Sequence, residues 1–437
     1  TNLVTALSLR WARPVIPVQL TTYEIQRALD VGFGDGVAGT GQGGHPLRVD
    51  LGEASPTDDA PAQLDCTLLH AIQKRASDIH IEPYRNDVDV RLRIDGVLAQ
   101  LQTHITPDNI NGVINRIKIL CGLDIAESRV SQDGGFRITL IDGERSSAVD
   151  CRASILPGPH GEDAVLRILD PHIGLVSLGE LGMTEAMGLE FERLLNNPEG
   201  TVLVTGPTGS GKSTTLYAAL DRLNDGRRKI LTAEDPIEYT LEKVNQKQVS
   251  PVMSMSALSR AFLRHDPDVI LIGEIRDEDT AETAAKAATT GHLVLGTLHT
   301  PDALGAIPRL RGLHLTDDQI SDTLLAVVSQ RLARRVCQHC AETWPITEEQ
   351  RRRLGILVAD WSGHTLHAKG CDQCNGMGYS GRVGIFELLL MDHELVTAIA
   401  EGLHGPGLRA LVRRRGNPSL VDDGLLKAQQ GTTTLDE

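Results

Sequence analysis

One short stretch combines glycines, a lysine and a serine in an order that could hold the phosphates of a nucleotide. An apolar run at 201–205 precedes it, and a predicted helix from about 213 to 223 follows it. In such a loop the glycines turn backbone N–H groups onto the β-phosphate, Lys212 supplies positive charge, and Ser213 offers a hydroxyl to Mg²⁺. The alternative is a flexible glycine-rich surface turn, which the strand, loop and helix order disfavours. The sequence predicts an ATP or GTP site formed by Gly206, Pro207, Thr208, Gly209, Ser210, Gly211, Lys212, Ser213 and Thr214.

Two acidic residues follow apolar runs and are candidates for holding Mg²⁺ and positioning the attacking water. The run 268–273 leads into Glu274, so a buried strand would deliver this carboxylate beside the phosphate loop. Because Gly273 occupies the usual aspartate position, the metal-binding acid is Glu274 or comes from elsewhere. Glu234 follows the run 229–233 and is the candidate general base or water-orienting group. For both acids the alternative is a solvated loop carboxylate.

Histidines and arginines near these runs could stabilise negative charge on the γ-phosphate. His292 and His299 bracket the apolar run 293–297, and the alternative for each is a satisfied structural histidine. Guanidinium groups supplied by a neighbouring domain or subunit would stabilise the same charge. A lone arginine is more often part of a surface or interdomain ion pair. The candidate arginines are Arg260, Arg264 and Arg276 around the acidic strand, and Arg152 and Arg167 farther upstream.

Four of the seven cysteines form two Cys-x-x-Cys pairs, in the pattern C-x2-C-x30-C-x2-C. Four thiolates satisfy tetrahedral Zn²⁺ and leave no open position, so we expect a structural site and not a catalytic one. An iron or redox site is the alternative, and zinc modules that bind nucleic acid raise the hypothesis of a DNA-processing enzyme. Cys66, Cys121 and Cys151 are expected to be buried thiols. The predicted zinc ligands are Cys337, Cys340, Cys371 and Cys374.

Composition limits the classes of protein to which the chain can belong. Its 437 residues exceed one ordinary core, and 41% apolar with 23% charged residues describe a globular protein. The net charge of −15 argues against a motor that gains its affinity from nucleic-acid phosphates. The sequence has neither a run of roughly 18 apolar residues nor a signal peptide, so we expect a cytoplasmic protein. The chain begins with Thr1 and not Met, which is consistent with a truncated or processed N-terminus.

The elements that must position these residues fall into three predicted regions. Residues 1–62 are expected to be a short, partly flexible segment and linker, since 32–44 is rich in glycine. Residues 63–172 are expected to form an α+β domain. In residues 173–437 apolar strands alternate with helices, which predicts a parallel sheet buried on both faces and a zinc-binding insertion at about 335–380. The predicted helices are 22–29, 63–75, 110–120, 213–223 and 347–354, and the predicted strands are 78–81, 88–94, 136–141, 147–155, 164–169, 202–205, 229–233, 269–273 and 293–297.

Taken together, these motifs resemble the secretion ATPase superfamily of type II secretion and type IV pilus assembly. The resemblance covers about residues 63–437 and extends beyond the nucleotide site. Residues 76–83 (Ala-Ser-Asp-Ile-His-Ile-Glu-Pro) are similar to a signature of the family's second N-terminal domain, and 91–98 to the Arg-x-Arg-x-Asp-Gly strand after it. The ending at 421–433 looks like the type II secretion branch. The nucleotide motifs that match are the Walker A box at 206–214, the Asp box at 230–239, the Walker B box at 268–277 and the His box at 289–300.

The resemblance implies a RecA-like P-loop ATPase core, a preceding PAS-like α+β domain and a C-terminal tetracysteine zinc module. It also implies a homohexamer that uses ATP and Mg²⁺ to turn a platform protein in the inner membrane. Such a protein lies in the cytoplasm, peripheral on the bacterial inner membrane, docks on a cytoplasmic domain of a secretion-system membrane protein and binds no nucleic acid. The family's N-terminal docking domain is shortened here to a glycine-rich segment, so docking is the least supported of these expectations.

Site roles also follow from the resemblance. Arg152 and Arg167 match arginines that the second N-terminal domain directs at the phosphates. Arg276, like Arg260 and Arg264, matches arginines near the nucleotide or the subunit interface. The rival hypotheses are a type IV pilus extension ATPase, a DNA-stimulated translocase and a nucleotide-binding scaffold without turnover. The expected catalytic set is Lys212, Glu234, Glu274, Arg152, Arg167, Arg276, His292 and His299, with Ser213 and Glu274 holding magnesium.

Overall fold

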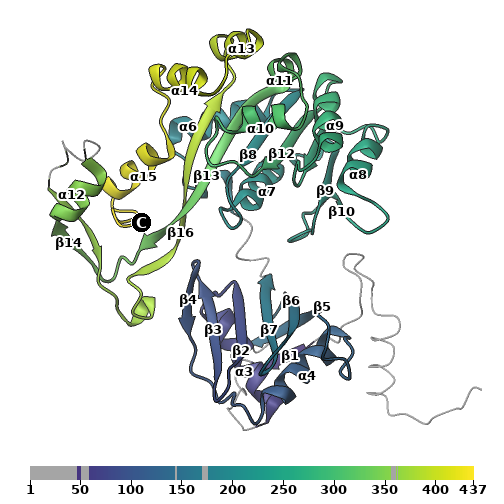
Figure 1. Cartoon of the computed structure of the whole chain (residues 1–437), viewed down its shortest axis with the longest axis vertical. Coiled ribbons are helices and arrows are strands. Elements are labelled where there is room, and N and C mark those ends of the chain that lie inside the picture. The colour runs from purple at the N-terminus through teal and green to yellow at the C-terminus, as the bar shows by residue number, and fades with distance from the viewer. Residues whose placement is uncertain (1–46, 51–58, 143–144, 170–175, 356–360, 362) are drawn as a thin grey trace, which may run out of the picture.

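The structure is a computed structural model that describes residues 47–50, 59–142, 145–169, 176–355, 361 and 363–437 (Figure 1). The predicted helix at 22–29, the glycine-rich stretch and the predicted boundary near 172 lie outside these residues. The described residues form two seven-stranded sheets and one two-stranded sheet. The mixed α/β architecture predicted from the sequence is therefore confirmed.

The first sheet is covered by helices on one face. Helices α3 (Ala60–Gln73) and α4 (Ile110–Cys121) share an apolar core with its strands. Along the strand Val88–Ile94, Leu92 is buried while Arg91 and Arg93 on either side of it are not, because alternate side chains point to opposite faces. The second face of the sheet therefore presents charged side chains. The strand order is β1 (Leu47–Asp50), β5 (Gln132–Asp142), β6 (Arg145–Gly158), β7 (Gly161–Leu169), β2 (Asp78–Pro83), β3 (Val88–Ile94) and β4 (Val97–Gln100), antiparallel except for β1 and β5.

The second sheet is buried on both faces. In β8, Val202 and Val204 belong to the core under α6 and α7, while Leu203 belongs to the core under α8 and α9. This alternation explains the continuous apolar runs of the sequence. The strand order is β10 (Asn245–Gln248), β9 (Ile230–Glu234), β11 (Val269–Ile272), β12 (Leu293–Leu298), β8 (Gly200–Thr205), β13 (Leu324–Val336) and β16 (Tyr379–Leu390), all parallel except β16. The helices are α6 (Glu185–Leu195), α7 (Lys212–Leu223), α8 (Met255–Phe262), α9 (Glu278–Thr289), α10 (Ala306–Gly312), α11 (Asp317–Thr323), α13 (His393–Ala400) and α14 (Gly405–Arg414).

A small module lies between β13 and β16 in the chain. Its strands β14 (Ala341–Pro345) and β15 (His364–Ala368) form the two-stranded sheet, and α12 (Glu348–Leu354) is the helix predicted there. Figure 1 shows the module beside the last helix, α15 (Leu420–Gln429). An apolar cluster joins the two, so the C-terminal segment holds the module against the large sheet. The cluster is centred on Ile346, Ala428 and Leu435.

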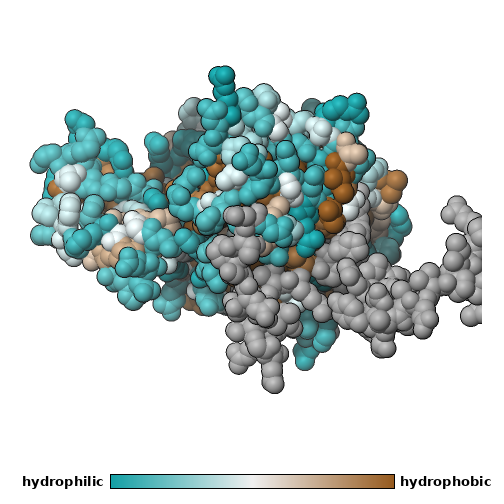
Figure 2. Space-filling model, turned by 90° about the horizontal axis from the view of Figure 1, so that it is seen from below, coloured by the Kyte–Doolittle hydropathy of each residue, from teal (hydrophilic) through white to brown (hydrophobic). Residues whose placement is uncertain are grey.

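The surface of the described residues is largely polar. In the view from below, hydrophilic residues dominate and hydrophobic ones appear in small areas (Figure 2). None of the helices in the described ranges is long and apolar enough to span a bilayer.

Candidate nucleotide site and metal centre

The phosphate loop joins β8 to α7 at the C-terminal edge of the parallel sheet. Gly206 and Gly211 have φ values of 152° and 87°, in the region that favours glycine. A Cβ atom on Gly206 would lie 2.5 Å from the carbonyl oxygen of Gln330, and one on Gly211 would lie 2.8 Å from its Nε2. The loop can therefore close this tightly only with glycine at both positions, which leaves the N-terminal end of α7 facing the space above it.

Lys212 begins α7 and reaches back over the loop. Its Nζ donates to the carbonyl oxygens of Gly206 at 2.9 Å and Pro207 at 3.0 Å. Burial lowers the pKa of Lys212, although the nearby Glu274 carboxylate partly opposes this. Ser210 lies in the same loop, and its Oγ is buried without a hydrogen-bond partner among the described residues. A phosphate group fits here, because it would give both side chains an acceptor.

Glu274 lies just beyond the end of β11, surrounded by cationic groups. Its carboxylate is 2.7 Å from Nη2 of Arg276 and 3.4 Å from Nε2 of His299. Partial burial raises the pKa of Glu274, but the hydrogen bond and charge of Arg276, with contributions from His299 and Lys212, outweigh burial and lower it. Glu274 is therefore an ionised carboxylate near the phosphate-loop lysine.

Glu234 ends β9 and is held differently. It is 5% exposed, and it accepts hydrogen bonds from the hydroxyl groups of Tyr217 and Thr232 and from Nε2 of Gln246 at 3.1 Å. Burial and the Glu234 charge raise the pKa of Tyr217, so this phenol remains a donor. Both carboxylate oxygens of Glu234 thus accept hydrogen bonds from other side chains of the protein. The Glu274 carboxylate instead interacts with Lys212.

The two predicted histidines lie at opposite ends of β12. His299 follows the strand and contacts Glu274, as described above. His292 precedes it, and its Nδ1 lies 2.9 Å from the carbonyl oxygen of Ala287. Since β12 pairs in parallel with β8, His292 is at the edge away from the phosphate loop, about 20 Å off at about 3.3 Å per residue. The structure does not bring His292 to the phosphate loop of its own chain.

The upstream arginines are neighbours on adjacent strands. Arg152 of β6 is directly opposite Arg167 of β7. Nη2 of Arg152 donates to the carbonyl oxygen of Ile237 at 2.8 Å, and Nη1 lies 3.8 Å from Glu238. Arg152 therefore contacts the loop after Glu234. Beside the second sheet, Arg260 pairs with Asp279 at 3.4 Å and Arg264 donates to the carbonyl oxygen of Arg260.

Two residues beside the phosphate loop were missed by the sequence analysis. Gln330 of β13 is buried, and its Oε1 accepts from the hydroxyl of Thr215 in α7 at 2.7 Å. Arg331 is anchored on the carbonyl oxygens of Pro301 and Gln330 at 2.6 and 2.9 Å, and its charge contributes to the lowered pKa of Lys212. The signal in the sequence is the polar triplet 329–331, which directly follows the apolar run 324–328.

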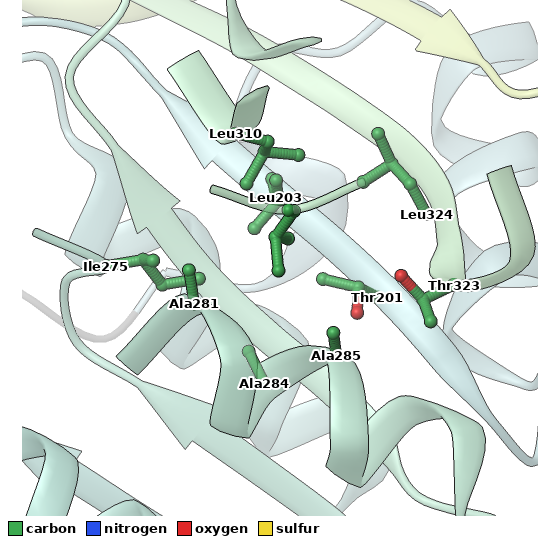
Figure 3. Close-up of a pocket in the computed structure, with 10 residues that line it drawn as sticks. Thr201, Leu203, Ile275, Ala281, Ala284, Ala285, Leu310, Thr323 and Leu324 are labelled. Atoms are coloured by element: carbon green, nitrogen blue, oxygen red, sulfur yellow. The ribbon is translucent and has the colours of Figure 1, made fainter. Parts of the chain in front are cut away.

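A cavity of about 20 Å³ lies elsewhere, between β8 and α9 (Figure 3). Its walls are alanine and leucine side chains, with Thr201 and Thr323 at one side. This volume is enough for about one water molecule and is far too small for a nucleotide. The candidate nucleotide site remains the edge of the sheet at the phosphate loop, where Lys212 and Glu274 lie. The cavity is a packing defect of the core.

The four cysteines of the two Cys-x-x-Cys pairs converge at the base of the small module. Their sulfur atoms all lie within 4.8 Å of one another, and three pairs are separated by 3.8 to 3.9 Å. A tetrahedron with Zn–S bonds of about 2.3 Å has sulfur atoms about 3.8 Å apart, so the geometry fits zinc. Burial raises the pKa of Cys374, but N–H donors of Cys371 and Gly378, with neighbouring thiols, lower it to about 7. The N–H donors thus favour the thiolate form of Cys374, whereas burial raises the pKa of the Cys340 thiol to about 12.

Comparison with known proteins identifies the family to which the chain belongs. The family model described as "Type II/IV secretion system protein" matches residues 57–437. "Type II secretion system ATPase E" of Vibrio cholerae is 45% identical over 90% of this chain and 77% of its own length. "Type IV pilus assembly ATPase PilB" of Thermus thermophilus is 44% identical over 87% of this chain and 43% of its own length. A crystal structure of "the Pilus Retraction Motor PilT and Bound ADP" is 28% identical, with a TM-score of 0.58 over 85% of this chain and 94% of that one. The chain belongs to the Type II/IV secretion system protein family.

Proposed function

We propose that this protein is an ATPase that powers pseudopilus assembly and protein export by a type II secretion system. One observation carries the catalytic part: Lys212, Glu274 and His299 converge at the edge of the parallel sheet where the phosphate loop lies. Family membership and the 45% identity to a type II secretion ATPase support the biological part.

The steps of the proposed chemistry are assigned to residues of the second sheet and of the loops that follow its strands. Lys212 exchanges the carbonyl oxygens of its own loop for the β- and γ-phosphates of ATP. Ser213 and Glu274 would hold Mg²⁺, which would neutralise phosphate charge when bound. Glu234 orients the attacking water, and to do so one of its oxygens exchanges an internal donor for that water. His299 and Arg276 keep Glu274 ionised and in place.

The first sheet would complete the site when the two parts of the chain close. Arg152 already touches the loop after Glu234, so a short movement would take its guanidinium from Ile237 and Glu238 to the phosphates. Arg167 lies beside it. Closure on ATP and opening after hydrolysis would provide the power stroke. His292, at the far edge of the sheet, has no place in this mechanism within one chain.

The assembly is proposed at the level of the family. We propose a homohexamer of the translocase class on the cytoplasmic face of the bacterial inner membrane. Its partners would be a platform protein and the cytoplasmic docking domain of a secretion-system membrane protein. The proposed domains are 63–172, 173–437 and a zinc insertion at about 335–380. The zinc would stabilise the module and take no part in catalysis.

A type IV pilus extension ATPase is the second candidate, because the pilus assembly ATPase of Thermus is nearly as similar. The type II candidate is favoured since its relative is covered over 77% of its length, against 43% for the pilus protein. Identification of the platform protein that co-purifies with the chain separates the two candidates.

The catalytic proposal is tested by Glu274→Ala in a phosphate-release assay. Turnover should be lost because Mg²⁺ loses its acid, while ATP binding, which rests on the phosphate loop, stays nearly intact. Glu278→Ala, an exposed acid at the start of α9, is the control and should turn over normally. An unchanged slow rate in the Glu274 variant would indicate a nucleotide-binding scaffold. Strong stimulation of the parent by DNA at physiological salt would indicate a nucleic-acid motor.

A further inference from the structure

Four charged residues form one row across the face of the first sheet opposite α3 and α4. The strand registers place Arg93 opposite Asp78, Asp78 opposite Arg167, and Arg167 opposite Arg152. Residues paired in register point to the same face of a sheet, so these side chains are neighbours. We call this set the arginine row. Through Arg152 it touches the loop after Glu234, so the row faces the nucleotide site.

Asp78 is the carboxylate in the middle of the arginine row. The residue is 7% exposed, and its Oδ1 accepts a hydrogen bond from Nε of Arg167 at 3.1 Å. Its Oδ2 accepts from the hydroxyl of Ser77 at 2.8 Å and lies 3.9 Å from Nε of Arg93. A buried carboxylate is tolerated only with such partners. Asp78 thus separates two guanidinium groups that would otherwise repel each other.

The contact with Asp78 uses only one of the donor groups of Arg167. The Arg167 side chain is 60% exposed, and in the described part of the chain its Nη1 and Nη2 have no partner. Elsewhere in the same sheet, Arg137 grips Asp150 through both Nε and Nη2, at 2.7 and 3.1 Å. The Arg167 contact instead leaves the paired Nη donors, the groups that match a phosphate, without a partner among the described residues.

We propose that Asp78 is a positioning residue for ATP hydrolysis, which aims the Nη groups of Arg167 at the phosphates by holding its Nε. The inference rests on the proposed role of Arg167. A guanidinium fixed before closure loses less rotational freedom when it meets the phosphates. The row also keeps a surplus of positive charge, three guanidinium groups against one carboxylate, which attracts a polyphosphate.

The test is a double-mutant cycle on the full chain, with Asp78→Asn, Arg167→Ala and the double variant assayed with Mg-ATP. Asp78→Asn keeps the size of the side chain and removes its charge. It should lower kcat/KM by about tenfold, and Arg167→Ala should lower it further. The double variant should equal Arg167→Ala, because the carboxylate has no role once its arginine is gone. Glu82→Gln is the matched control: it removes an ion pair with Arg91 on the same face of the same strand, and turnover should not change.

The outcomes separate this inference from the proposed function. If Arg167→Ala impairs turnover and Asp78→Asn does not, the inference is wrong and the role of Arg167 stands. Losses that multiply in the double variant would give Asp78 a separate, structural role and would also overturn it. If Arg167→Ala has no effect, both roles are lost, while Glu274→Ala still decides the ATPase proposal. Should Asp78→Asn melt early, all variants are assayed at a temperature where circular dichroism shows them folded, and the cycle remains decisive.

Discussion

The position of the Glu234 carboxylate depends on a hydrogen bond from the Tyr217 hydroxyl. The hydroxyl of Tyr217 donates to one carboxylate oxygen of Glu234, deep between α7 and β9, and the N–H of Glu238 donates to the same hydroxyl at 3.3 Å. Tyr217→Phe would leave a buried carboxylate short of a donor. We expect a loss of about 1–3 kcal/mol in the free energy of unfolding. Chemical denaturation of the variant and the parent protein measures this difference in the free energy of unfolding. Tyr84→Phe removes an exposed Tyr–Glu bond of 2.9 Å and should cost far less; equal losses would contradict the assigned role of burial.

Glu387, a half-buried acid, should make the stability of the protein depend on pH. Glu387 lies in β16, and burial, with the nearby charge of Asp302, raises its pKa. For a carboxyl group whose pKa is raised by folding, the charged form opposes folding, so stability is lost as pH rises through the folded pKa. Glu387→Gln should therefore raise the melting temperature at pH 8 by about 2 °C. The gain should vanish near pH 4.5, at the ordinary pKa of about 4.3.

The control for this comparison is Glu282→Gln, an exposed residue that pairs with Lys286. Scanning calorimetry of each variant at both pH values gives the difference directly. A gain of the same size at both pH values would show that shape, not charge, separates glutamine from glutamate at position 387.

At the scale of elements, the strands that were predicted best are those whose sheet is covered by helices on both faces. The runs that became β8, β9, β11 and β12 are apolar throughout, since helices cover both faces of their sheet. β13 was not predicted, because its second half turns polar where Gln330 meets α7. β16 begins with the exposed residues around Gly381 and was missed for the same reason. A polar triplet inside a strand marks a contact that periodicity alone does not reveal.

The sequence predicts the position of a candidate site residue when that residue directly follows or precedes a strand of the parallel sheet. Glu274 and His299 follow strands that run parallel to β8, so both must reach the edge where the phosphate loop lies. His292 precedes its strand, and the same rule, applied strictly, would have placed it at the other edge. Contacts from β13 depend on how a distant segment joins the sheet, which no local pattern determines.

The zinc module yields a prediction at the same scale. We expect about one zinc ion per chain by metal analysis, because the four sulfur atoms already match the tetrahedral spacing. Chelation should loosen the β14–β15 sheet and lower the melting temperature, since metal binding stabilises such modules. Cys340→Ser should abolish the zinc, whereas Cys66→Ser, at a partly exposed thiol of α3, should retain it. A thiol titration of native protein that finds all seven cysteines free would contradict the zinc site.

At the scale of the whole molecule, two polar contacts within the described residues join the parts of the chain that carry the two large sheets. Near the nucleotide site, Arg152 meets the loop after Glu234. At the turn between β3 and β4, Asp95 accepts a hydrogen bond from the N–H of Gly381 at 2.7 Å and lies 3.5 Å from Nε of Arg382. The second place lies at the start of β16, next to the cysteine cluster.

These two contacts differ in what ATP binding would do to them. In the proposed mechanism, Arg152 exchanges its contacts with Ile237 and Glu238 for the phosphates. Asp95 takes no part in that exchange, because its partner is the backbone N–H of Gly381. If the Asp95 contact is kept while Arg152 is released, the proposed closure is a rotation of the first sheet about Asp95. The lever arm of that rotation is the width of the sheet from β6 to β4.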